Sequence, residues 1–100
     1  MARQIGKQSL TFREAPFIME SASIGGTREA ALSMVLEKAG VDAGEVRYLF
    51  AGDLLGQTIA TSFGVLDFQI PLFGLYGACS TAGESLGLAA MTVAAGYADL

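Results

Sequence analysis

The stretch "LFGLYGACSTAG", residues 72–83, decides the fold predicted for this chain. Residues 72–76 are apolar apart from the Tyr76 hydroxyl, and a strand without alternation is typical of a parallel sheet covered by helices on both faces. A helix predicted over 81–95 carries no charge after Glu84 and is apolar all round. Such a helix belongs inside a structure, so we expect it to be central and buried.

The rest of the chain repeats this alternation of strand and helix. Apolar residues recur at helical spacing after Thr27, a plausible N-cap, and Gly40 ends that helix. Short turns between the elements favour parallel strands joined by right-handed crossovers. The predicted order is β-α-β-α-β-α, with strands over 17–21, 45–51 and 72–76 and helices over 27–39, 54–66 and 81–95.

Composition limits the class of protein. Of the 100 residues, 52% are hydrophobic and 16% charged, an apolar excess that predicts a fragment of a larger domain or a tight oligomer. The uncharged stretches fall short of a membrane span, and the N-terminus has no signal-peptide core. One cysteine fits a reducing compartment, and a net charge of −4 without a basic run argues against nucleic acid.

Two chemically useful residues follow predicted strands. Asp53 comes after the second strand and Cys79 after the third, and ligands of open α/β sheets bind at these carboxyl ends. The amino end of the helix after Cys79 would favour its thiolate, which predicts a reactive thiol facing a pocket.

Structural roles compete with these functional ones. By its position alone, Cys79 fits a small apolar core residue as well as a site residue. Asp53 fits the N-cap of the next predicted helix as well as a ligand-binding residue. Ser80 and Thr81 are natural cap residues, and Glu84 completes a capping box with Thr81. Spacing and composition alone leave these alternatives open.

Longer motifs carry a resemblance to a known family. The segment "GACST" looks like the nucleophilic-cysteine turn of the thiolase and ketoacyl synthase superfamily. The stretches "LFAGDLLGQTIATSFGV" (49–65), "PLFGLYGACSTAGESLGLAAMTVAAGYAD" (71–99) and "FIMESASIGG" (17–26) closely resemble the stage V sporulation protein AD family of endospore formers, which has the thiolase fold. The resemblance implies a thiolase-like layered α/β fold, of which this chain holds the N-terminal βαβαβα portion.

The same resemblance implies a function in the spore. Members of that family are associated with binding dipicolinic acid and moving it into the developing spore. Carried over, Asp53 of AGDLL and Cys79 and Ser80 of GACST line the ligand pocket. Calcium is the ion that the resemblance would place with the ligand, and no cofactor is implied. The implied partners are other proteins of the dipicolinate-transport complex and a second copy in a homodimer, at the cytoplasmic face of the forespore or spore inner membrane.

An acyl-transferring enzyme with Cys79 as nucleophile is the alternative function, and a purely structural partner in a membrane-associated complex is a third. Acyl transfer usually needs a histidine base, and the chain contains no histidine. The sequence also departs from the family pattern, because Gly26 runs almost directly into the first helix and Leu100 precedes the second thiolase-like half. We therefore expect an arm over 1–16 and an incomplete thiolase-like domain over 17–100.

Overall fold

The computed structural model describes residues 2–21, 28–53 and 65–100. Its order of elements mixes short strands, α-helices and 3-10 helices, so the chain is α/β. The strands are β1 (Ala2–Ile5), β2 (Ser9–Phe12), β3 (Leu49–Gly52) and β4 (Leu72–Leu75), the α-helices are α1 (Arg28–Ala39) and α3 (Thr81–Ala94), and the 3-10 helices are η1 (Ala43–Glu45), η3 (Leu66–Phe68) and η4 (Ala78–Ser80).

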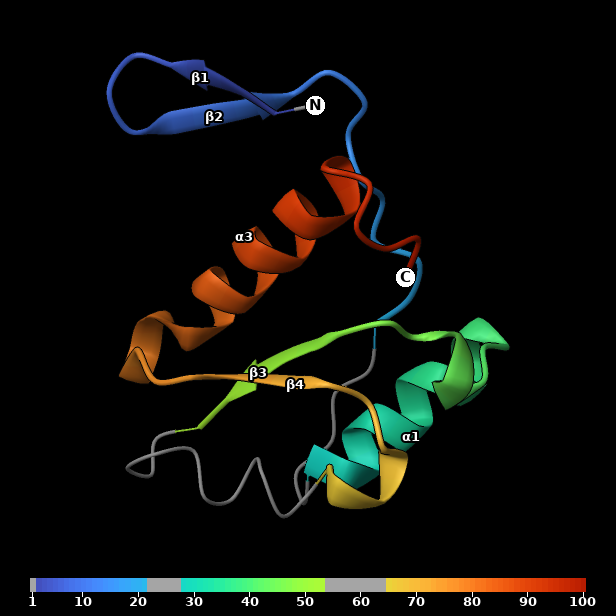
Figure 1. Ribbon diagram of the computed structural model, residues 1–100. Coiled ribbons are helices and arrows are strands. Elements are labelled where there is room, and N and C mark those ends of the chain that lie inside the picture. The colour runs from blue at the N-terminus through green and yellow to red at the C-terminus, as the bar shows by residue number, and fades with distance from the viewer. Residues whose placement is uncertain (1, 22–27, 54–64) are drawn as a thin grey trace.

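The parallel pair β3–β4 organises the body of the molecule. Its register places Leu49 opposite Leu72 and Gly52 opposite Leu75, which confirms the prediction of adjacent parallel strands. Figure 1 shows α3 on one side of this pair and α1 on the other. The Phe50 and Phe73 rings stack with centroids 5.0 Å apart, so cross-strand aromatic contact supports the hydrogen-bonded ladder.

Two predicted helices are found close to their predicted bounds. The first ends at Ala39, and Gly40 follows with φ +67, the left-handed conformation that glycine adopts most readily. Its predicted N-cap, Thr27, lies outside the described residues. The last helix, α3, begins at Thr81 as predicted and ends at Ala94, two residues before Gly96. Helical spacing of apolar residues was therefore a sound guide to these two segments.

The first predicted strand is wrong. Residues 17–21 form no strand, and the side chains of Phe17 and Ile18 are 94% and 74% exposed. Instead Lys38 of α1 donates a hydrogen bond from Nζ to the Ser21 carbonyl (2.6 Å) and pairs with Glu20 (3.6 Å). An apolar run becomes a strand only where another strand offers ladder partners, and none of the described residues does so here.

The second predicted strand and the second predicted helix have other bounds in the structure than in the sequence analysis. The second strand begins at Leu49 rather than at residue 45, because Ala43–Glu45 form the 3-10 helix η1, and there the Asp42 amide donates to Glu45 Oε2 (2.9 Å). Of the helix predicted over 54–66, residues 54–64 lie outside the described residues. Val65 forms a turn and Leu66 begins η3, so that helix does not include its last two predicted residues.

The predicted burial of the sheet and of the last helix is also wrong for this chain. In β4, Phe73 is 49% exposed, and along α3 Leu86, Leu88 and Met91 are 59%, 39% and 42% exposed. An apolar helix is buried all round only when packed layers surround it, whereas α3 has the small β3–β4 sheet on one side. No helix of the described residues is long and apolar enough to cross a membrane.

The predicted arm contains a structure that the sequence did not reveal. Strands β1 and β2 pair antiparallel, with Ala2 opposite Phe12 and Ile5 opposite Ser9, and Gly6 takes φ +65 in the connecting turn. This hairpin projects at one end of the molecule, beyond the end of α3 (Figure 1).

Candidate functional site

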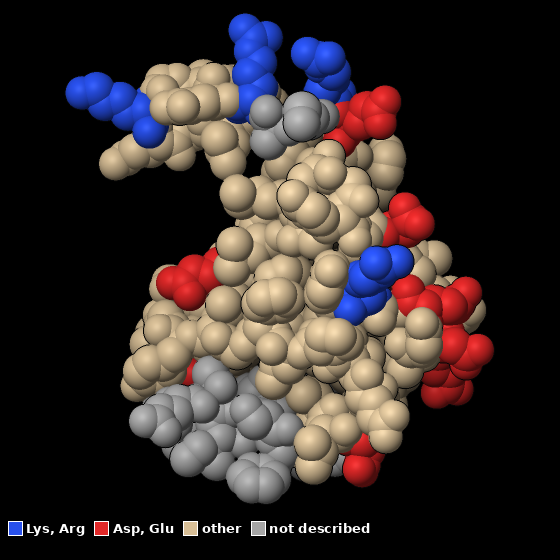
Figure 2. Space-filling view, in the orientation of Figure 1, with Lys and Arg blue, Asp and Glu red and all other residues tan. Residues whose placement is uncertain are grey.

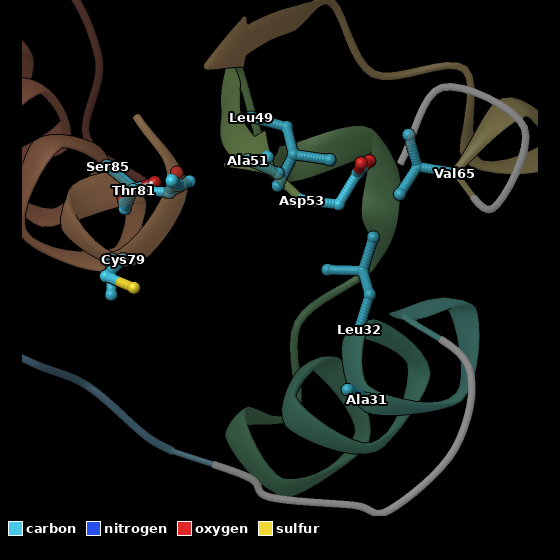
Figure 3. Close-up of a pocket in the computed structure, with 12 residues that line it drawn as sticks. Ala31, Leu32, Leu49, Ala51, Asp53, Val65, Cys79, Thr81 and Ser85 are labelled. Carbon is cyan, nitrogen blue, oxygen red and sulfur yellow. Dashed lines mark hydrogen bonds between the residues drawn. The ribbon is translucent and has the colours of Figure 1, made fainter. Parts of the chain in front are cut away.

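A cavity of about 460 Å³ opens at the carboxyl end of β3 and the amino end of α3. Leu49, Ala51 and Asp53 line it from alternate positions, because successive side chains of a strand point to opposite faces, and Gly52 at the end of β3 lines it as well. Figure 3 shows Asp53 and Leu49 on the β3 side, Leu32 on the α1 side and Cys79 at the start of α3. The described lining residues are Ala31, Leu32, Leu49, Ala51, Gly52, Asp53, Val65, Ala78, Cys79, Thr81, Ala82 and Ser85.

The turn from β4 into α3 places Cys79 at this cavity. Ala78 has φ +50, a left-handed conformation that is strained for a residue with a Cβ atom. The Gly77 amide donates to Thr81 Oγ1 (3.1 Å), and the Ser80 amide donates to the Gly77 carbonyl (3.0 Å). These hydrogen bonds fix the sharp reversal that turns the chain out of the sheet and into the helix.

Cys79 lies in η4 at the amino end of α3, and its side chain is exposed. Figure 3 shows its sulfur directed toward the space bounded by β3 and α1. The alternative of a cysteine buried in the core does not agree with this placement. The amide of Thr81, the first residue of α3, donates to the Ala78 carbonyl, and the dipole of α3 places partial positive charge at this wall of the cavity.

Asp53 directly follows β3 and is 4% exposed, among the most buried side chains of the described residues. The residue before it, Gly52, explains how β3 and β4 come so close. A Cβ atom on Gly52 would collide with the Leu75 carbonyl oxygen and would lie 2.6 Å from Thr81 Cγ2. Absence of a side chain at Gly52 therefore lets the ends of both strands meet α3, which brings Asp53 and Cys79 to one cavity.

Ser80 is placed differently from the other two predicted site residues. It is not among the residues that line the cavity. Its hydroxyl lies 2.7 Å from the Gly77 carbonyl and 2.9 Å from Glu84 Oε1, so its single proton is shared between these acceptors. The Glu84 carboxylate thus accepts a hydrogen bond from the Ser80 hydroxyl, and it does not form the predicted capping box with Thr81.

Thr81 and Ser85 are polar lining residues that the sequence reasoning did not assign to the site. They stand one helical turn apart, so they share a face of α3, and the Ser85 hydroxyl donates to the Thr81 carbonyl (2.7 Å). Thr81 is 9% exposed. The i, i+4 spacing of hydroxyl residues just after the turn was the signal available in the sequence.

The chemistry of the cavity follows from its lining. The described lining residues include no lysine, arginine or histidine, and Asp53 is their carboxylate. The Ser85 hydroxyl proton is donated to the Thr81 carbonyl, so the Thr81 hydroxyl, which accepts from the Gly77 amide, is the side-chain donor of these two residues, and Leu32, Leu49 and Val65 make apolar wall. Within residues 2–21, 28–53 and 65–100, no group of three or more histidine, cysteine, aspartate or glutamate side chains is placed to hold a metal ion on its own.

Comparison with known proteins adds an independent line of evidence. Residues 28–100 match the family model described as stage V sporulation protein AD. The chain is also similar to the stage V sporulation protein AD of Bacillus subtilis (strain 168), with 33% identity over 70 residues. That match covers 70% of this chain and 21% of the relative, so the chain spans about a fifth of the relative's length.

Proposed function

This chain belongs to the stage V sporulation protein AD family, and on that premise we propose that it binds dipicolinic acid, accompanied by calcium, during the uptake of this compound into the developing spore. Family membership gives the sporulation role, and the ligand is the proposal. The observation that carries it is the cavity at the carboxyl end of β3, which both Asp53 and Cys79 line although they are 26 positions apart in the sequence.

The ligand is a small planar dianion, and the cavity offers suitable contacts for one. The amino end of α3 supplies backbone donors and a favourable dipole for a carboxylate. The Thr81 hydroxyl lies on the same side of the cavity and keeps its proton for the ligand, whereas the Ser85 proton is donated to the Thr81 carbonyl. Apolar side chains such as Leu32 and Leu49 complete the wall, and they suit the faces of an aromatic ring.

Asp53 needs a separate role, because a carboxylate repels a bare dianion. Calcium takes oxygen ligands from carboxylates and from bound anions together. In this proposal Asp53 contributes one oxygen ligand to a calcium ion that the dipicolinate itself chelates. The described residues then need no metal cluster of their own, since the ligand brings most of the coordinating atoms.

An acyl-transfer enzyme is the alternative function, and the exposure of Cys79 at the cavity favours it. The Cys79 thiol would attack the carbonyl carbon of an acyl thioester. An acyl-cysteine forms, the bond between the acyl group and the substrate's sulfur breaks, and the substrate's thiol leaves with the proton. The chain contains no histidine to act as the base, which is why ligand binding is preferred. Incubation with acetyl-coenzyme A followed by intact mass spectrometry separates the two, because only the enzyme gains an acetyl group on Cys79.

Location and assembly are part of the same proposal. A peripheral place at the cytoplasmic face of the forespore or spore inner membrane, beside other proteins of dipicolinate transport, would put the cavity next to its ligand. In the described residues β4 pairs only with β3, which leaves the outer edge of β4 available for a second copy. A homodimer through this edge is the assembly we propose.

The experiment measures protection of Cys79 by the ligand. Iodoacetamide alkylates the exposed thiol of the native chain, and intact mass spectrometry follows the rate. We expect calcium and dipicolinate together to slow alkylation, and calorimetry to show weaker dipicolinate binding for Cys79→Ala and for Asp53→Asn. Ser33→Ala, an exposed position on α1, serves as the matched control with unchanged binding.

Two outcomes would contradict the proposal. One is alkylation at the same rate with and without dipicolinate. The other is normal dipicolinate binding by both Cys79→Ala and Asp53→Asn, with circular dichroism confirming that each variant keeps its fold. A loss of binding in the Asp53 variant alone, restored at higher calcium, would support the calcium role given to this residue.

A further inference from the structure

Thr81, the first residue of α3, is a polar side chain that the structure buries at the cavity. It is 9% exposed, and of the described residues Asp53 is the other buried polar one, at 4%. Figure 3 shows Thr81 on the α3 side of the cavity and Asp53 on the β3 side. Burial of a hydroxyl group is unfavourable unless its hydrogen-bonding groups have partners. The partners of this hydroxyl therefore show what Thr81 can do at the site.

The side chain of Thr81 is held at both branches of its Cβ atom. Its Oγ1 accepts a hydrogen bond from the Gly77 amide (3.1 Å) in the turn that follows β4. Its Cγ2 methyl lies against Gly52, so close that a Cβ atom added to Gly52 would be 2.6 Å from it. A β-branched side chain has few favourable χ1 rotamers, and these two contacts select one of them. The hydroxyl oxygen is thus fixed in position where the end of β3 meets α3.

The direction in which this hydroxyl can hydrogen-bond is restricted as well. A hydroxyl group has one proton and two lone pairs, and the Gly77 amide already donates to a lone pair of Oγ1. The Ser85 hydroxyl donates to the Thr81 carbonyl and leaves Oγ1 alone. Among the described residues no acceptor is placed for the Thr81 hydroxyl proton. Thr81 therefore presents a hydrogen-bond donor to the cavity.

The absence of cations from the described wall makes this donor important. The described lining residues include no lysine, arginine or histidine. Figure 2 shows most of the visible blue side chains at the hairpin end of the molecule, beyond the carboxyl end of α3, whereas the cavity lies at the amino end of that helix. A carboxylate in the cavity therefore has to find uncharged donors, and the Thr81 hydroxyl is one.

We propose that Thr81 is a specificity-determining residue of the cavity, which donates its hydroxyl proton to a carboxylate oxygen of the ligand. This inference rests on the proposed function and names the side chain that recognises one carboxylate of dipicolinate. Because Gly52 and Gly77 hold the side chain in place before the ligand binds, little rotamer freedom is lost on binding. The dipole of α3 favours negative charge at the same end of the helix, which strengthens a hydrogen bond to a carboxylate.

The same geometry explains how the cavity would discriminate between ligands. A carboxylate only accepts hydrogen bonds, so it matches the donor that Thr81 presents. A ligand with an apolar group at this position would leave the buried hydroxyl proton without an acceptor. Sites built to hydrogen-bond a polar group reject analogues that lack it, because the polar group of the protein is then left unpaired.

The test compares two pairs of side chains at position 81 that differ in the hydroxyl group. Threonine and Thr81→Val share the branched shape, and Thr81→Ser and Thr81→Ala share the absence of the methyl group. With calcium present, we expect calorimetry to give a Kd for dipicolinate that is at least about tenfold higher for the member of each pair without the hydroxyl. We expect Thr81→Ser to stay within about threefold of the unmodified chain, since it keeps the donor and loses only rotamer restriction.

Thr92→Val is the matched control, because it makes the same change on the same helix away from the cavity. The Thr92 hydroxyl donates to the Leu88 carbonyl (2.8 Å), and Thr92 does not line the cavity. We expect its Kd for dipicolinate to equal that of the unmodified chain. Circular dichroism of every variant checks that the fold is kept, and the second pair of variants retains the comparison if Thr81→Val does not fold.

A spectroscopic measurement distinguishes direct contact from a role in holding the turn. Infrared spectra of dipicolinate with isotope-labelled carboxylate carbons separate the ligand's carboxylate bands from those of the protein. We expect the band of the bound ligand to lie at one frequency in the unmodified chain and in Thr81→Ser, and at another in Thr81→Val and Thr81→Ala. A residue that only held the turn would change the Kd without this dependence on the hydroxyl.

Three outcomes would overturn the inference. If dipicolinate binds equally to both members of each pair, Thr81 does not recognise it, and the proposed function stands. If all three Thr81 variants weaken binding to the same extent and leave the carboxylate band unchanged, Thr81 acts only through the turn, and again the proposed function stands. If the unmodified chain does not bind dipicolinate at all, the proposed function is wrong and this inference is wrong with it.

Discussion

The turn at residues 77–81 and the hairpin at residues 2–12 are both short, and each contains a glycine next to a reversal of the chain. In the turn, Gly77 faces the Glu84 carboxylate so closely that a Cβ atom would lie 2.6 Å from Glu84 Cδ. In the hairpin, a Cβ atom on Gly6 would meet nothing within 4 Å. Packing therefore limits a substitution at Gly77, whereas at Gly6 the backbone conformation, with φ +65, limits it although space is open.

The comparison extends to the surroundings of each region. The turn meets β3, β4 and α3 at once, and its hydrogen bonds include Gly77 to Thr81 and Ser80 to Glu84. The hairpin is joined mainly by its own ladder, with Ile5 and Leu10 exposed. Changes at the turn should thus alter both stability and the cavity, whereas changes in the hairpin should alter neither by much. Four substitutions test this contrast.

The largest expected effect is that of Gly52→Ala. The new Cβ atom would overlap the Leu75 carbonyl and crowd Thr81 Cγ2, and backbone atoms cannot move aside cheaply. We expect a loss of about 3 kcal/mol in the free energy of unfolding. Urea unfolding followed by circular dichroism measures it. Gly87→Ala in α3 is the matched control, since its Cβ meets nothing within 4 Å and should stabilise the helix by about 0.5 kcal/mol. Equal behaviour of the two variants would contradict the packing argument.

The second effect is that of Gly77→Ala, which crowds a side chain rather than backbone. Because the Glu84 carboxylate can swing away, we expect a smaller loss of about 1 kcal/mol. A double-mutant cycle with Glu84→Ala checks the cause. If the loss from Gly77→Ala is the same with and without Glu84, the contact between these residues is not its origin.

The third effect has the opposite sign. Ala78→Gly removes the Cβ atom from a residue with φ +50, so relief of strain should exceed the added freedom of the unfolded chain and stabilise the protein by about 0.5 kcal/mol. Ala82→Gly, on the first turn of α3, is the control and should destabilise. A loss of stability in Ala78→Gly would show that Ala78 is not strained in solution.

The smallest effect is expected in the hairpin. Leu10→Ala removes a side chain that is 47% exposed, so the free energy of unfolding of dilute protein should change by no more than about 0.5 kcal/mol. A loss of several kcal/mol in dilute protein would mean that the hairpin packs on its own body.

Much of the site was predictable from the sequence, while its surroundings were not. Asp53 and Cys79 each follow a predicted strand, and the rule for parallel strands places such residues at one edge. Both line the cavity. Ser80 was assigned to the same pocket, yet its hydroxyl turns to Gly77 and Glu84, because the strained turn at Ala78 sets its direction. Thr81 was treated as a cap, and its place in the cavity depends on packing against Gly52.

By itself the sequence determined the local elements that depend on nearby residues. Helical spacing placed α1 and α3, Gly40 ended the first, and an unbroken apolar run gave β4, since these features need only interactions within a few residues. Tertiary structure decided what neighbours must supply. Residues 17–21 have no strand beside them among the described residues, so they form no ladder. One side of α3 is exposed, and residues 2–12 pair into a hairpin. Pairing and burial are relations between distant segments, so no local pattern fixes them.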